Sequence, residues 1–321
     1  MTNENRDRSA ERVGRIGSSD VGAILPGIEH PYRSPLAVYQ VVKGTYEGDD
    51  LSASLHVRIG CDLEQMGLDA YAERTGREVK KLGTLDCPAF PFLGCTVDGY
   101  CPETKTIVEV KCTFAGWTEP PPYHWAQVRW QGTILETNDI AVDEICIVVV
   151  RLGGFAPTIE YHVRRFEDCR EQATQEFGYI VDWWARHIEK SSPPDATGES
   201  VRDGSAGRQY PQRETAIIEA DDEQTEAIRT YAKWRDRREF AELQEREAKA
   251  QLMSIIGEKK GIERAGLGRV TWSERKPSSR VDYKAIIKEI EPDEAIIERH
   301  TRISSGGRTF RWTKAKQQEE T

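Results

Sequence analysis

The chain has 321 residues, of which 38% are hydrophobic and 31% are charged, and its formal net charge is -9. This length suffices for about two domains of roughly 150 residues, and the composition excludes a disordered polyelectrolyte. The longest uninterrupted apolar run, residues 145–150, is far too short to span a bilayer, so we expect no membrane partner. Any contact with nucleic acid must come from a local basic surface or from bound metal, because the net charge is negative.

The cysteines and the first residues indicate where the protein works. Seven cysteines without a Cys-x-x-Cys pair are typical of reduced thiols, not of a disulfide framework or a zinc ribbon. Residues 1–15 are polar and charged and contain no apolar segment, which argues against a secretory signal. We therefore expect a cytoplasmic protein.

Short helical and strand-like patterns alternate up to residue 190. Ser34-Pro35 resembles a helix N-cap followed by proline at the first helical position, and Gly44 marks the end of that helix. The further expected elements are a helix at 55–74, strands at 92–97 and 106–112, a helix at 123–136, strands at 145–151 and 158–163, and a closing helix at 166–190. This order predicts an α/β (α+β) fold, in which helices flank a central mixed sheet.

The second part of the chain has a different character. A stretch rich in serine, proline and glycine indicates a linker at 191–220, after a core at 1–190. Residues 221–321 then form an extension, which begins with a long charged helix or a helical hairpin at 221–256. Strands at 270–272 and 309–312, with a short helix at 283–290 between them, make it a small α+β unit.

The expected strand Ile107-Val108-Glu109-Val110-Lys111-Cys112 carries the residues with the clearest chemistry. Because side chains alternate along a strand, Glu109 and Lys111 share one face. If a hairpin around 102–105 pairs this strand with the one that ends at Val97-Asp98, Asp98 lies beside Glu109. Two carboxylates and one ammonium group then converge.

The same residues also have a purely structural interpretation. Glu109 and Lys111 can form a surface pair on a half-buried strand, with Asp98 merely starting a turn. An Asp followed about ten residues later by Glu-x-Lys is a short pattern that matches by chance often. The motif alone therefore decides nothing.

Five ordered motifs across residues 10–190 carry a resemblance. They are Arg12 to Asp20, Gly60 to Glu64 followed by Tyr71 and Thr75-Gly76, Asp98-Gly99, Glu109 to Cys112, and Ala126-Gln127-Val128. In this order they resemble the motifs of the lambda-exonuclease and YqaJ-like viral recombinase family of phage exonucleases. The resemblance implies a PD-(D/E)XK restriction-endonuclease-like core.

Hydrolysis of a phosphodiester needs a deprotonated water and a way to hold the charge that builds on the phosphoryl oxygens, and a divalent metal ion supplies both. Asp98 and Glu109 are the expected ligands, and oxygen ligands favour Mg²⁺ or Mn²⁺. The resemblance implies that the Val110 carbonyl completes a first metal site and that Glu64 helps a second. Lys111 then orients or deprotonates the attacking water with a pKa lowered by the metal, and Gln127 positions the lysine or the water.

The resemblance also implies a pocket for the 5'-phosphate of a recessed duplex end. Arg12 and Ser19 occupy the matching positions, and guanidinium and hydroxyl groups suit a phosphate. Ser18-Ser19-Asp20 can equally be a simple helix N-cap, and the two interpretations are compatible because helix starts favour phosphate.

The function implied by the resemblance is exonucleolytic degradation of linear double-stranded DNA, 5' to 3', in the host cytoplasm if the protein is phage-encoded. It leaves 3' single strands for an annealing recombinase partner, and a ring-like trimer or tetramer is the implied assembly. The alternatives are a structure-specific or restriction-like endonuclease on the same fold, and a non-catalytic scaffold that binds DNA ends.

Overall fold

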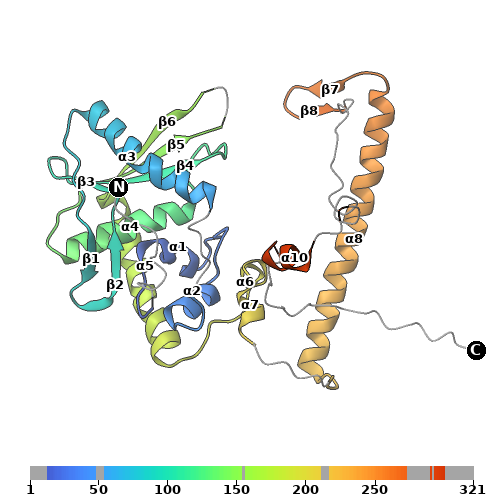
Figure 1. Cartoon of the computed structure of the whole chain (residues 1–321), viewed down its shortest axis with the longest axis horizontal. Coiled ribbons are helices and arrows are strands. Elements are labelled where there is room, and N and C mark those ends of the chain that lie inside the picture. The colour runs from blue at the N-terminus through green and yellow to red at the C-terminus, as the bar shows by residue number, and fades with distance from the viewer. Residues whose placement is uncertain are drawn as a thin grey trace, which may run out of the picture. The chain divides into compact units, whose positions relative to one another are not determined.

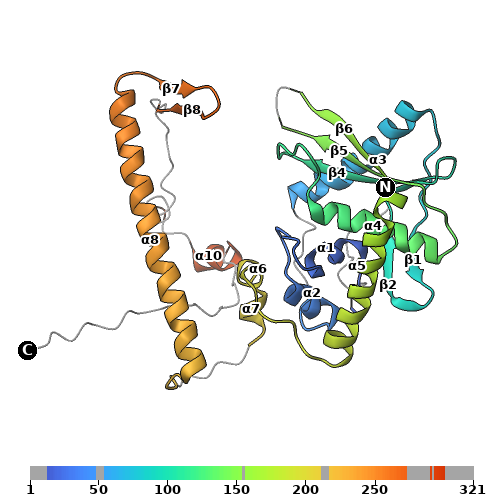
Figure 2. The same cartoon turned by 180° about the vertical axis from the view of Figure 1, so that it is seen from behind.

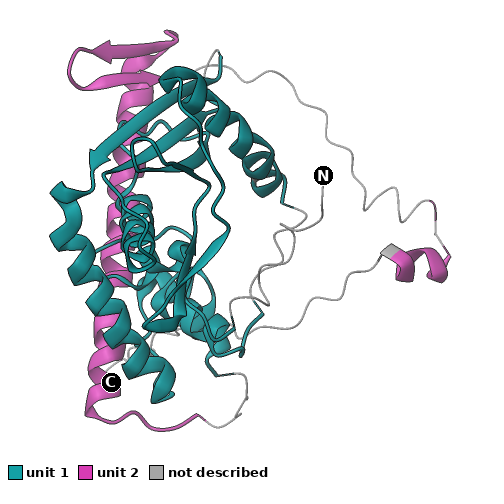
Figure 3. Cartoon of the chain, turned by 90° about the vertical axis from the view of Figure 1, so that its left-hand side faces the viewer, with its two compact units in different colours: residues 1–212 teal, residues 213–321 magenta. Residues whose placement is uncertain are grey.

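The structure is a computed structural model that describes residues 13–47, 54–153, 156–210, 217–272, 290 and 293–300. The chain divides into two compact units, residues 1–212 and residues 213–321, which Figure 3 colours separately. None of the described helices is long and apolar enough to cross a membrane. Each unit is considered by itself below.

The centre of unit 1 is a four-stranded mixed sheet in the order β3-β4-β5-β6 (Figure 1). Its strands are β3 (Gly99–Cys101), β4 (Thr106–Thr113), β5 (Glu144–Arg151) and β6 (Thr158–Arg165). The pair β4 and β5 is parallel, whereas the two outer pairs are antiparallel. A parallel pair needs a long crossover, and helix α4 (Pro122–Thr137) provides it.

Both faces of this sheet are covered by helices, which explains why β5 is a continuous apolar run. On one face Val108, Val110 and Val148 pack with Leu68 and Tyr71 of α3 (Leu55–Thr75). On the other face Ile107 and the β5 residues Ile145, Ile147 and Val149 pack with α4, α1 (Ser18–Ile24) and α5 (Arg170–Trp183). Figures 1 and 2 show this arrangement from opposite sides. The expected mixed sheet flanked by helices is confirmed.

The capping residues set several helix ends as predicted. The Ser34 side chain accepts a hydrogen bond from Ala37 N at the start of α2 (Pro35–Val42), with proline at the first position. Helix α3 ends at Gly76, whose φ of 68° lies in the left-handed region that glycine adopts without strain.

The hairpin before the Glu-x-Lys strand differs from the prediction. β2 (Phe90–Thr96) does not pair with β4; it forms a separate two-stranded sheet with β1 (Thr84–Cys87). The partner of β4 is the short strand β3, which begins directly after Asp98. The reason is tertiary, because Trp130 of α4 donates to the Gly94 carbonyl and Leu93 forms a bridge to Ile16.

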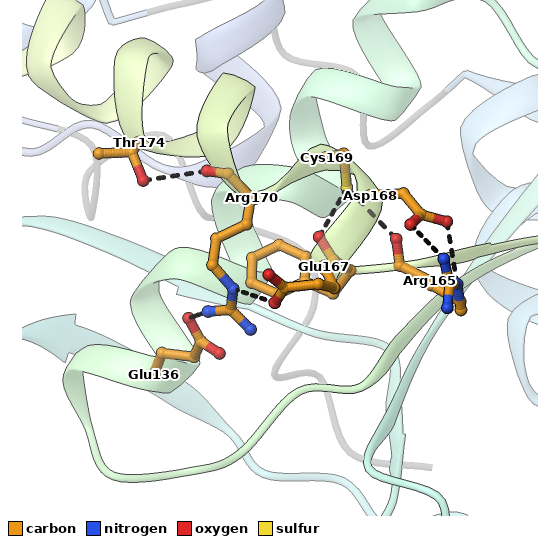
Figure 4. Close-up of polar contacts among 8 residues, drawn as sticks. Glu136, Arg165, Glu167, Asp168, Cys169, Arg170 and Thr174 are labelled. Atoms are coloured by element: carbon orange, nitrogen blue, oxygen red, sulfur yellow. Dashed lines mark hydrogen bonds and ion pairs between the residues drawn. The ribbon is translucent and has the colours of Figure 1, made fainter.

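Helix α5 is joined to its surroundings by ion pairs that lie mostly at the surface (Figure 4). It follows a short 3₁₀ turn, Glu167–Cys169, and continues as a π-helix over Trp184–Glu189. Arg170 contacts both Glu167 and Glu136 at the end of α4, and so connects the two helices.

Part of the expected linker is folded. Two short helices, α6 (Gly198–Arg202) and α7 (Ser205–Arg208), belong to unit 1. Ser205 Oγ lies 3.0 Å from Ser34 Oγ, and the Ser205 carbonyl accepts a hydrogen bond from Gln40 Nε2 at 2.9 Å. These buried polar contacts join α7 to α2. A local sequence pattern cannot indicate this pairing, because the partners lie 165 and 171 positions apart.

Unit 2 begins with the long charged helix that the sequence predicts. Helix α8 (Asp222–Ile256) starts with a capping box, in which Asp221 accepts from Gln224 N and Gln224 accepts from Asp221 N. A hairpin of β7 (Gly261–Arg264) and β8 (Gly268–Thr271) follows, and α10 covers Glu294–His300. The strand expected at 309–312 and residues 283–289 of the helix expected at 283–290 lie outside the described residues, and residue 290 is helical.

Candidate active site

Strand β4 presents Glu109 and Lys111 on the sheet face that α4 covers. Glu109 is 2% exposed, and Lys111 Nζ lies 2.6 Å from Glu109 Oε1. Val108 and Val110 point to the opposite face, into the apolar cluster with α3. The alternation of the strand therefore produces a buried acid and its cation directly beside an apolar layer.

Asp98 lies next to Glu109 on the neighbouring chain segment. Gly99 pairs with Val108, so Asp98 stands opposite Glu109, and its Oδ2 accepts a hydrogen bond from Val110 N at 2.8 Å. Burial and the nearby Glu109 carboxylate raise the pKa of Asp98 to about 8, against the opposing effect of Lys111. Two acids are thus held close together in a site where a second negative charge is unfavourable.

Helix α4 adds two amide side chains to this acid pair. Gln127 Nε2 donates to Glu109 Oε1 at 2.6 Å, and Gln131 Nε2 donates to Glu109 Oε2 at 2.8 Å. Residues four apart lie on one face of a helix, so both amides reach the same carboxylate. Sequence reasoning missed Gln131, and its only local signal is this spacing from Gln127.

Lys111 is held as a cation by its neighbours. Burial alone would lower its pKa, but the Glu109 and Asp98 carboxylates outweigh burial and raise the pKa. The lowered pKa expected from the sequence applies to a metal-loaded site and stays a prediction.

Glu64 belongs to the neighbourhood of the acid pair but not to its hydrogen-bond network. It projects from α3, which packs on the opposite face of the sheet, and its Oε1 pairs with Lys81 Nζ at 3.1 Å. Its charge nevertheless contributes to raising the pKa of Asp98 and of Lys111. Across the described ranges, no three His, Cys, Asp or Glu side chains are grouped closely enough to hold a metal ion.

The residues expected to bind a 5'-phosphate are only partly visible. Arg12 lies outside the described residues. Ser19 is exposed in the first turn of α1, and the N-cap of this helix is Gly17, not a serine. Asp20 is buried, accepts a hydrogen bond from Gly17 N at 3.1 Å and forms an ion pair with Arg33. Arg33 thus balances the negative charge that counts against phosphate binding here.

Helix α1 is pressed closely onto the start of α4. A Cβ atom at Gly22 would lie 2.7 Å from Tyr123 Cβ, so only glycine permits this approach. Trp125 and Trp130 are core residues, and Arg129 is buried with its Nη2 2.5 Å from Glu176 Oε1. Of the aromatic residues at the start of α4, Tyr123 and His124 keep partial exposure.

The donor set of the site suits a hard divalent cation. Glu109 and Asp98 offer only oxygen atoms, and no His or Cys side chain hydrogen-bonds to either carboxylate within the described part of the chain. Of the donors described, only Val110 N reaches the Asp98 carboxyl group. The residues therefore fit one Mg²⁺ or Mn²⁺ ion, whereas Glu64 would have to leave Lys81 to serve a second.

Part of the chain, including the site, matches a known protein family. Residues 9–131 match the model of the YqaJ-like viral recombinase domain, a range that includes Glu64, Asp98, Glu109, Lys111 and Gln127. No curated protein matches the chain.

Solved structures of three exonucleases are similar to part of the chain. The alkaline exonuclease from Laribacter hongkongensis is 17% identical, with a TM-score of 0.41, over 57% of this chain and 95% of that one. A putative exonuclease from Eubacterium rectale is 10% identical, with a TM-score of 0.45, over 68% and 96%. A phage-related exonuclease from Haemophilus somnus 129PT is 11% identical, with a TM-score of 0.38, over 56% and 96%.

With TM-scores below 0.5, the function has to be argued from the side chains themselves. The family model matches the segment in which the ordered motifs lie. The resemblance that those motifs carry is thereby confirmed for residues 9–131, which are similar to the YqaJ-like viral recombinase domain.

Proposed function

We propose that the protein is a metal-dependent deoxyribonuclease that degrades linear double-stranded DNA from its ends. The observation that carries the proposal is the cluster of Asp98, directly before β3, with Glu109 and Lys111 on β4, and with Gln127 donating to the Glu109 carboxylate. The YqaJ-like domain supports a phage-type nuclease.

In this proposal Asp98, Glu109 and the Val110 carbonyl hold a first Mg²⁺ or Mn²⁺ ion, and Glu64 contributes to a second. When bound, such an ion supplies positive charge to the oxygens of the phosphoryl and leaving groups and lowers the pKa of a water molecule. Asp98 must be ionised to bind the metal ion. Its raised pKa opposes this ionisation until a cation is present.

Lys111 acts next to the reacting phosphate through its ammonium group. Without metal its raised pKa makes it a hydrogen-bond donor. A bound cation would lower this pKa, so in the loaded site Lys111 orients or deprotonates the attacking water. Gln127 keeps Glu109 Oε1 in place beside Lys111 Nζ, because both nitrogens donate to this one oxygen.

The end preference belongs to the same proposal. Ser19 in the first turn of α1 and Arg12 before it bind the 5'-phosphate, which gives 5'-to-3' polarity and leaves a 3' single strand. A ring-like trimer or tetramer gives processivity, and a single-strand annealing recombinase takes up the product. These steps rest on the family resemblance.

A digestion time course tests the proposal. The substrates are linear duplex labelled at either end, with a 5'-phosphate or a 5'-hydroxyl, and covalently closed circular DNA, each with Mg²⁺ or with EDTA. We expect Mg²⁺-dependent loss of nucleotides from 5'-phosphorylated ends of the linear duplex only. Efficient cutting of the circle would identify the restriction-like or structure-specific endonuclease instead.

Two variants test the site itself. Glu109→Gln keeps the shape of the side chain but removes the charge, and we expect it to abolish hydrolysis. Glu103→Gln is the matched control, since Glu103 is a 70% exposed acid in the turn between β3 and β4. If Glu109→Gln hydrolyses DNA at the wild-type rate, the catalytic assignment is wrong. If wild type binds ends but hydrolyses nothing with Mg²⁺ or Mn²⁺, the protein is the non-catalytic scaffold.

A further inference from the structure

Gln131 is a fully buried amide on α4 whose hydrogen bonds are unevenly distributed. Its Nε2 donates both to Glu109 Oε2 at 2.8 Å and to the Thr96 carbonyl at 3.0 Å. Its Oε1 is buried and has no hydrogen-bond partner among the described residues. Both hydrogens of the Gln131 amide nitrogen are therefore used, whereas the amide oxygen accepts no hydrogen bond from the described residues.

The orientation of this amide is set by its partners. Turning the amide over would bring Oε1 against Glu109 Oε2 and the Thr96 carbonyl, which are both acceptors. A buried acceptor without a donor destabilises the fold, and an apolar side chain of the same length would avoid that cost. What glutamine contributes at this position is therefore the pair of hydrogen bonds that its Nε2 donates.

The donors around Glu109 determine which of its oxygens stays available. An ionised carboxylate has about four acceptor positions, two on each oxygen. Lys111 and Gln127 both donate to Oε1, whereas among the described residues only Gln131 donates to Oε2. Oε1 is thus saturated, and the open acceptor position of this carboxylate is on Oε2.

We propose that Gln131 is a positioning residue that holds the Glu109 carboxylate so that Oε2 is the oxygen available to the divalent cation. Gln131 and Gln127 lie on two successive turns of α4 and donate to different oxygens of the Glu109 carboxylate, which prevents rotation about the Cγ–Cδ bond of Glu109. This inference rests on the proposed function, since it assigns a role at the same metal site.

The test is Mn²⁺ binding to the full-length protein without DNA, followed by the electron paramagnetic resonance signal of free Mn²⁺. Gln131→Met keeps the length of the side chain and removes the donor, and we expect Mn²⁺ affinity to fall by about 10- to 100-fold. Gln175→Met is the matched control, because the Gln175 amide is exposed on α5 and donates to Glu171. Should Gln131→Met fail to fold, Gln131→Asn is the second variant, because it keeps the amide but is too short to reach Glu109. We expect it to lower the affinity for Mn²⁺ in the same way.

A double variant shows whether the effect passes through Glu109. In a Glu109→Gln background, Gln131→Met is expected to change Mn²⁺ affinity no further, since the carboxylate that it positions is gone. Wild-type Mn²⁺ affinity in Gln131→Met, or a full additional loss in the double variant, would overturn the inference while leaving the nuclease proposal intact. Wild type that binds Mn²⁺ but never hydrolyses DNA would defeat the proposed function instead, and wild type that binds no Mn²⁺ would overturn both.

Discussion

Removing the charge of Lys111 gives the sharpest test of how the buried acid is held. Lys111 Nζ lies 2.6 Å from Glu109 Oε1, and the two side chains are 20% and 2% exposed. At an effective dielectric constant of about 20, this contact is worth roughly 6 kcal/mol before desolvation is counted. Removing one partner of a buried pair typically costs about 3–5 kcal/mol, because the other charge is left without its counter-ion.

We expect Lys111→Met to lose about 3 kcal/mol of unfolding free energy, the lower end of that range, for two structural reasons. Lys111 keeps some contact with water, and the Gln127 and Gln131 amides still donate to Glu109 in the variant. In a Glu109→Gln background the same substitution should cost much less, since no buried charge is then stranded.

The assay is urea unfolding of the full-length protein in EDTA, followed by tryptophan fluorescence. Five of the eight tryptophans lie in residues 1–212, so the signal reports mainly on unit 1. Lys81→Met is the control, because Lys81 is 59% exposed in its pair with Glu64 and should lose less than about 1 kcal/mol. A loss in Lys111→Met no larger than in this control would refute the reasoning.

Three further predictions concern the site and its support. The pKa of Asp98 is raised to about 8, so the metal-free fold favours the neutral acid. Neutral Asp98 therefore contributes fully to the stability of the fold below about pH 4, and this contribution is lost as the pH rises through 8. Mn²⁺ affinity should accordingly increase up to about pH 8, and a titration of Asp98→Asn that keeps this pH dependence would contradict the assignment. Gln127→Leu should lower kcat by about 10- to 100-fold with little change in KM, as steady-state digestion of labelled duplex can measure. Gly22→Ala should cost about 1–3 kcal/mol in urea unfolding, because its Cβ would lie 2.7 Å from Tyr123 Cβ, whereas Gly178→Ala, with open space around its Cβ, should not destabilise.

The elements that depend on local chemistry could be predicted from the amino-acid sequence. Ser34-Pro35 starts a helix and Gly76 ends one, because caps act within a few residues. Period-two alternation placed Glu109 and Lys111 on one face, whereas Asp98 was expected beside them only if a hairpin formed, and the structure forms that hairpin with the short strand β3. The ordered motifs indicated a resemblance to a family, and the model of that family matches residues 9–131.

The tertiary structure decided the contacts that join distant segments. It separated β2 from β4, folded α7 onto α2, and turned Glu64 toward Lys81 instead of toward Glu109. It also brought Gln131 to the carboxylate, although nothing in the pattern of a buried helix distinguishes that amide from a surface residue. The physical reason is that alternation and capping act over a few residues, whereas the hydrogen bonds of a buried acid depend on how a helix docks onto a sheet.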